Sequence, residues 1–116
     1  MDRRKELKEQ YKNMKPDMGV FIIKSNIKNK CYIEGTQDLK STINSTKFKL
    51  ELGFHPNKEL QKEWKECGEE NFSIEILEKL KYDKDESKED YSEELNILKI
   101  LWEDKLTENG MEFYKK

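Results

Sequence analysis

The chain has 116 residues, 41% of them charged, and its formal net charge is only −2. This length predicts one domain, and 26 Ile, Leu, Val and Phe residues allow a small core beneath a heavily charged surface. The chain lacks a run of ~18 apolar residues, the apolar stretch of a secretory signal, and enough cysteine or histidine for a disulfide framework or zinc site. We therefore expect a cytoplasmic protein with no membrane partner.

The first half contains a helical pattern followed by two strand-like runs. Leu7, Tyr11 and Met14 fall on one helical face, which predicts an N-terminal helix over residues 2–15. Residues 19–24 and 30–34 are rich in β-branched and aromatic side chains and are separated by a polar turn. They predict a β-hairpin.

The middle of the chain predicts two helices and a third strand. A short polar helix is expected within residues 37–49. Asn57 is placed to cap a second helix that Gly68 ends. Residues 72–76 alternate between apolar and polar side chains, which is typical of a strand with one buried face.

The last third begins with an acidic stretch, residues 81–94, without apolar periodicity, and we interpret it as a solvated loop. Apolar spacing from Tyr91 to Leu106 then predicts a final amphipathic helix. The whole pattern predicts a single α/β (α+β) domain over residues 1–116. In it, a small three-stranded antiparallel sheet, built from the hairpin and the 72–76 strand, is flanked by helices.

Charge is unevenly distributed along the chain. Residues 1–66 carry 15 basic and 10 acidic side chains, whereas residues 67–116 carry 8 basic and 15 acidic side chains. The mildly basic first part could contact phosphates. A solvated surface of mixed charge explains the same composition equally well.

Two short motifs in the hairpin lie eleven residues apart: Gly19-Val20-Phe21, and a second motif that begins at Tyr32 and continues Ile33-Glu34-Gly35-Thr36. His55-x-Asn57, Leu60-Gln61, Trp64, Gly68, the strand from Phe72 and a closing Trp102-Glu103 follow in order. Over residues 18–107 this order and spacing resembles the GIY-YIG nuclease superfamily, in particular a small stand-alone member of bacterial or phage type.

The resemblance implies hydrolysis of a phosphodiester in DNA or RNA with one divalent metal ion, Mg²⁺. In that family a carboxylate on the last helix holds the metal, and an arginine on the helix after the hairpin stabilises charge on the phosphate oxygens. Hairpin tyrosine hydroxyls help to activate water. A cation and a guanidinium each lower the cost of the negative charge that develops in the transition state.

Several family positions hold other residues in this chain. The first family tyrosine corresponds to Phe21, which lacks the hydroxyl, while the second is kept as Tyr32 beside Glu34, where the family has glycine. The arginine position is Thr42, and Lys99 occupies the position of the metal-binding glutamate. His55 matches a family histidine. These departures imply a catalytically degenerate nuclease-like domain that retains nucleic-acid binding, with no metal ligand at Lys99.

Two alternatives remain open at this stage. Lys47 or Lys49 could replace the arginine and contact phosphate, and Glu93, Glu94 or Glu103 could supply a carboxylate. Glu103 is the best placed of the three, since it lies one helical turn from Lys99. Such a shifted site would make an active Mg²⁺-dependent DNA endonuclease. A protein-interaction module on the same scaffold is the other alternative, because fold does not determine function.

A geometric expectation follows from the resemblance. Phe21, Tyr32, Thr42 and Lys99 should line one concave surface, because the corresponding family groups must reach the same phosphate. In that surface Lys99 could bind a phosphate oxygen as a point charge.

Overall fold

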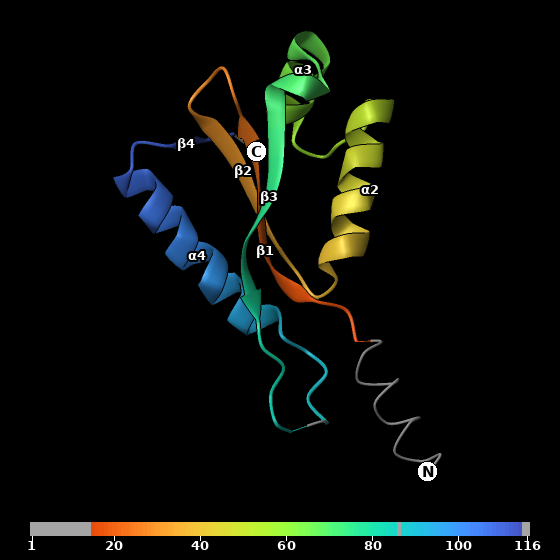
Figure 1. Cartoon of the computed structure of the whole chain (residues 1–116), viewed down its shortest axis with the longest axis vertical. Coiled ribbons are helices and arrows are strands. Elements are labelled where there is room, and N and C mark those ends of the chain that lie inside the picture. The colour runs from red at the N-terminus through yellow and green to blue at the C-terminus, as the bar shows by residue number, and fades with distance from the viewer. Residues whose placement is uncertain (1–14, 86, 115–116) are drawn as a thin grey trace, which may run out of the picture.

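The computed structural model describes residues 15–85 and 87–114. Figure 1 shows these residues as a mixed α/β fold, which confirms the predicted class. Apart from Lys15, the helix expected over residues 2–15 lies outside the described residues. The elements in chain order are β1 (Met18–Ser25), β2 (Lys30–Thr36), α2 (Leu39–Leu52), α3 (Lys58–Cys67), the 3-10 turn η1 (Glu69–Asn71), β3 (Phe72–Leu80), α4 (Ser92–Glu108) and β4 (Glu112–Phe113).

The strands form one sheet in the order β3-β1-β2-β4. The predicted hairpin is present as the antiparallel pair β1 and β2, and β1 also pairs antiparallel with β3. A fourth strand, β4, was not predicted; it runs parallel to β2 with Lys30 opposite Glu112. A two-residue strand is too short to show the alternating pattern by which strands are recognised in a sequence. It forms because the backbone of residues 112 and 113 reaches the free edge of β2. The Tyr114 amide donates a 3.0 Å hydrogen bond to the Cys31 carbonyl there.

Gly19, the glycine of the first hairpin motif, is required by the close approach of β1 and β3. A Cβ atom at this position would lie 2.1 Å from the carbonyl oxygen of Glu78. The register of β1 against β3 also shifts between Val20 and Phe21. A side chain at position 19 would therefore force the two strands apart.

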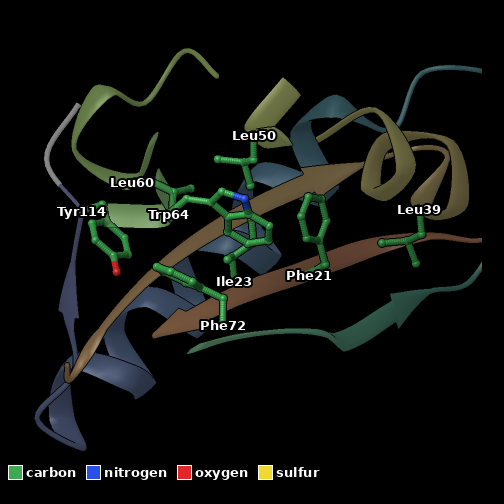
Figure 2. Packing of buried hydrophobic residues seen from close by; sticks show 8 residues of the cluster. All are labelled: Phe21, Ile23, Leu39, Leu50, Leu60, Trp64, Phe72 and Tyr114. Atoms are coloured by element: carbon green, nitrogen blue, oxygen red, sulfur yellow. The ribbon is translucent and has the colours of Figure 1, made fainter. Parts of the chain in front are cut away.

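Helices cover both faces of the sheet, with α2 and α4 on opposite sides (Figure 1). The alternation of β1 sends Phe21 and Ile23 to the α2–α3 side, and Val20 and Ile22 to the α4 side. Figure 2 shows the larger cluster, which comprises Phe21, Ile23, Leu39, Leu50, Leu60, Trp64, Phe72 and Tyr114. The core is thus split by the sheet into two layers.

Side-chain caps and glycines set the ends of the two helices on the α2–α3 side. Asp38 accepts a hydrogen bond from the Ser41 amide at the start of α2, and Asn57 accepts one from the Leu60 amide at the start of α3. Gly53 and Gly68, both at φ +87°, follow the two helices. The predicted Asn57 cap and Gly68 stop are both present.

The acidic loop is shorter than predicted. It begins after β3 at Lys81, but α4 begins at Ser92, so residues 92–94 are helical. Tyr91 and Leu95 are buried and anchor this end of α4. Glu93 and Glu94 lie in the first turn, where the helix dipole favours negative charge, and this explains why an acidic sequence is helical there. Among the described residues, no helix has the length and apolar character needed to cross a membrane.

Candidate functional site

Tyr32 and Glu34 lie two residues apart on the same face of β2. The Tyr32 hydroxyl donates a 2.6 Å hydrogen bond to Glu34 Oε1. Burial raises the pKa of Tyr32, and the hydrogen bond and negative charge of Glu34 raise it further. The phenol is therefore neutral near pH 7, and its proton is held in a hydrogen bond to a carboxylate within the site.

His55 packs against Tyr32 from the loop between α2 and α3. Their ring centroids are 5.2 Å apart in an edge-to-face arrangement. His55 is buried, and its Nδ1 accepts a 3.0 Å hydrogen bond from the Asn57 amide. Burial lowers the pKa of His55; the charge of Lys49 also lowers it, while Glu34 raises it. The imidazole is thus neutral at pH 7 and held in a fixed orientation.

Thr42 links the start of α2 to the end of β2. Its Oγ1 lies 2.6 Å from Oγ1 of Thr36, so each hydroxyl has the other as a hydrogen-bond partner. Thr36 in turn accepts a 3.1 Å hydrogen bond from the Asp38 amide. The position where the resemblance places an arginine therefore carries a neutral side chain engaged in a structural contact.

A cleft lies between β2 and α4, and we call it the β2–α4 cleft. It has two adjoining hollows of about 310 Å³ and 240 Å³, and Glu34 and Lys99 line both. The first hollow also includes Thr36, and the second also includes Tyr32 and Glu103. The structure thus brings Tyr32 together with Lys99, from elements more than sixty residues apart in the sequence.

The other candidate residues lie in three different places. Phe21 is fully buried in the core beneath the site, with its Cα paired to that of Glu34, and does not line the β2–α4 cleft. Lys49 is close enough to His55 to affect its pKa. Lys47 lines a separate groove with Trp64, between acidic residues of α2 and η1.

Sequence reasoning treated Glu34 only as a lost glycine and missed its contact with Tyr32. The alternation of a strand was the available signal, since residues 32 and 34 must point to the same side of β2. Thr36 was also missed as the partner of Thr42. Strand alternation again was the available signal, since residue 36 must point to the same side of β2 as residue 34.

The residues of the site do not fit the divalent metal that the resemblance implies. Among residues 15–85 and 87–114, no group of three or more His, Cys, Asp or Glu side chains could hold a metal ion. Glu103 shares the β2–α4 cleft with Lys99, whose ammonium would repel a cation. Glu94, another proposed substitute, instead forms a 3.0 Å ion pair with Lys88.

Comparison with known proteins finds no matching family model and no matching curated protein. Among solved structures, the catalytic domain of the homing endonuclease I-TevI matches with a TM-score of 0.65 and 23% identity, covering 85% of this chain and 99% of that chain. A variant of the catalytic domain of intron endonuclease I-TevI matches with a TM-score of 0.64 and 24% identity, covering 85% of this chain and 92% of that chain. The chain has the GIY-YIG nuclease fold.

The residues that differ from the expected family pattern lie on different elements of this fold. Phe21 lies on β1, Thr42 on α2 and Lys99 on α4. Of the four residues expected to line one concave surface, Tyr32 and Lys99 line the second hollow, whereas Phe21 and Thr42 line neither hollow of the β2–α4 cleft. The fold resemblance stated from the hairpin motifs is confirmed by the match over 85% of the chain. The match establishes the GIY-YIG fold.

Proposed function

We propose that this chain is a catalytically degenerate GIY-YIG domain that binds the phosphates of nucleic acid without hydrolysing them. The observation that carries the proposal is the composition of the β2–α4 cleft. Lys99 lines its second hollow together with Tyr32, whose hydroxyl donates a hydrogen bond to Glu34. The ammonium of Lys99 can bind a phosphate oxygen, whereas it would repel a metal ion.

Two roles of the family mechanism lack their expected group, and the tyrosine that matches the third is already engaged by Glu34. Thr42 has no charge to stabilise phosphate oxygens, and its hydroxyl is engaged by Thr36. Tyr32 is a poor acceptor of a proton from water, because it is neutral and already bonded to Glu34. Lys99 replaces the carboxylate expected to hold the metal. Loss of one such group commonly reduces a rate by orders of magnitude, so we expect no cleavage by the metal mechanism.

Phosphate binding is supported by the cations around the site. Helix α2 carries Lys40, Lys47 and Lys49 against a single acidic residue, Glu51, and of these lysines Lys49 is the one that acts on His55. Lys49 lies on the side of α2 that faces His55, and Lys99 approaches from α4. A strand that crosses the site would therefore meet lysines from two separate elements, which suits a run of phosphates.

A shifted active site is the second candidate, favoured by one observation: Glu103 lines the same hollow as Tyr32. For this site to work, a metal would have to bind Glu103 and Glu34 despite the ammonium of Lys99, which lines the same hollow. A catalytically degenerate domain does not require a metal ion to bind beside the positive charge of Lys99. It is therefore the function that we adopt.

The proposal is tested by binding at several salt concentrations, using fluorescence anisotropy with labelled DNA and RNA. We expect log affinity to fall linearly with log salt, because bound lysines release counterions from the phosphates. Lys99→Gln should reduce the slope by about one. Lys105→Gln, on the same helix, is the matched control and should change it less. Absence of binding to any DNA or RNA at low salt would overturn the proposal in favour of a protein-interaction module.

A further inference from the structure

Two phenylalanines form an exposed pair at the end of α2. Phe48 is 58% exposed and Phe54 is 54% exposed, although both are large apolar side chains. Their ring centroids lie 6.3 Å apart and the rings are nearly perpendicular, at 84°. In an edge-to-face pair the edge of one ring covers one face of the other, so ring faces remain open to solvent. We call Phe48 and Phe54 the phenylalanine pair.

The backbone holds the phenylalanine pair in place. Gly53, at φ +87°, reverses the chain after α2, and the Phe54 amide donates a 3.0 Å hydrogen bond to the Lys49 carbonyl. This turn returns Phe54 to the last turn of α2, beside Phe48. The pair is therefore a defined surface feature produced by the helix ending.

The phenylalanine pair adjoins the candidate site. Lys49 follows Phe48, and His55 follows Phe54; these two neighbours interact electrostatically on the side of Tyr32. Lys47 precedes Phe48 on α2. The open aromatic rings are thus flanked along the chain by two lysines, and Lys49 and His55 connect the phenylalanine pair to Tyr32.

We propose that the phenylalanine pair is a base-stacking platform for single-stranded nucleic acid. This inference rests on the proposed function and names its ligand class. Aromatic rings beside a cationic path are the two elements that bind single strands: bases stack on the rings, and backbone phosphates contact the lysines. In a duplex the base faces are buried in the stack, so a duplex offers only its phosphates. The lysines beside the rings favour a polyanion over a purely apolar partner.

The experiment compares short labelled DNA and RNA single strands with the duplex of the same sequence, by fluorescence anisotropy at low and moderate salt. The wild-type chain should bind the single strands more tightly than the duplex. Phe48→Ala should weaken single-strand binding roughly 5- to 150-fold, the range for loss of one stacked base, and leave duplex binding nearly unchanged. Phe48→Trp should retain binding, whereas Phe48→Leu keeps apolar bulk without a ring and should bind like Phe48→Ala.

Leu101→Ala is the matched control, since Leu101 is an equally exposed apolar residue (59%) on α4. It should bind like the wild type, and thermal melts should show that every variant is folded. Equal binding of duplex and single strand, with no effect of Phe48→Ala, overturns the platform while leaving the proposed function standing. No binding of either form overturns both. A concentration-dependent dimer in light scattering that Phe48→Ala abolishes assigns the pair to contact between two copies, which also overturns the platform.

Discussion

The Tyr32 hydroxyl lies 2.6 Å from Glu34 Oε1 and donates a hydrogen bond to that carboxylate. Both residues face the same side of β2, and both line the second hollow of the β2–α4 cleft together with Lys99. Glu34, which the resemblance places at a family glycine, thus controls the proton of Tyr32, the tyrosine expected from the second hairpin motif. The substitution at position 34 therefore bears directly on the chemistry of the site.

Removing the Glu34 carboxylate should lower the pKa of Tyr32. Glu34→Gln removes the negative charge, and Glu34→Gly removes the hydrogen bond as well, so each variant should shift the pKa toward the ordinary value of ~10. Because burial also raises this pKa, it should remain above that value. NMR titration of ¹³C-labelled tyrosine gives the measurement, with Tyr32→Phe assigning the signal. An unchanged titration in both variants would contradict the assigned role of Glu34.

His55 should make stability depend on pH between about 7 and 5. Folding lowers its pKa below the ordinary value of ~6.5, so the unfolded chain takes up more protons as the pH falls through this window. The free energy of unfolding should therefore decrease from pH 7 to pH 5. His55→Asn, which keeps an acceptor for the Asn57 amide, should flatten the dependence. Urea unfolding at a series of pH values gives the comparison, and an equal slope in both proteins would refute this assignment.

Gly19→Ala should lower the free energy of unfolding more than Gly53→Ala does. A Cβ at position 19 meets the Glu78 carbonyl at 2.1 Å, whereas a Cβ at position 53 meets nothing within 4 Å. Backbone overlap of this kind costs at least about 1–3 kcal/mol. Gly53→Ala carries only the cost of a left-handed backbone, roughly 1–2 kcal/mol. Denaturant unfolding measures both, and an equal loss would argue against the tight β1–β3 approach.

Much of the fold could be predicted because its signals are local. Asn57 caps α3 through a contact three residues away. The alternation of residues 72–76 predicted the start of β3, although the expected buried face is incomplete, since Phe72 is buried and Ile76 is exposed. The two-residue strand β4 could not be predicted, since its pairing depends on the edge of β2, some eighty residues earlier. The acidic start of α4 was missed for a related reason, because burial of Tyr91 and Leu95 outweighs the polar composition around them.

The candidate site was only partly predictable. The motif spacing placed Tyr32 and Lys99, which the structure brings to one cleft. It did not indicate that Phe21 lies in the core or that Lys47 lies in another groove, because spacing along a strand or helix does not state what packs above it. The contacts Tyr32–Glu34 and Thr36–Thr42 were missed because they require the side chains to be placed in three dimensions.

Lys99→Glu should create weak affinity for divalent cations in the β2–α4 cleft. The new carboxylate would join Glu34 and Glu103 around the same hollow, and oxygen ligands suit Mg²⁺ and Mn²⁺. Titration calorimetry with MnCl₂ should detect binding in this variant and not in the wild type. Lys105→Glu makes the same charge change on an exposed part of α4 and should not bind. Equal binding by both variants would show a general effect of charge and contradict the cleft geometry.

The most direct test of the degenerate site is a nicking assay of the wild-type chain on plasmid and branched DNA, with Mg²⁺ or Mn²⁺. With Thr42 engaged by Thr36, Tyr32 hydrogen-bonded to Glu34, and Lys99 where the resemblance expects the metal ligand, we predict no nicking above the metal-only background. Protein prepared in parallel as Tyr32→Phe serves to detect a contaminating nuclease, whose activity the substitution would not change. Metal-dependent nicking by the wild type that Tyr32→Phe abolishes would contradict the account and establish an active, shifted site.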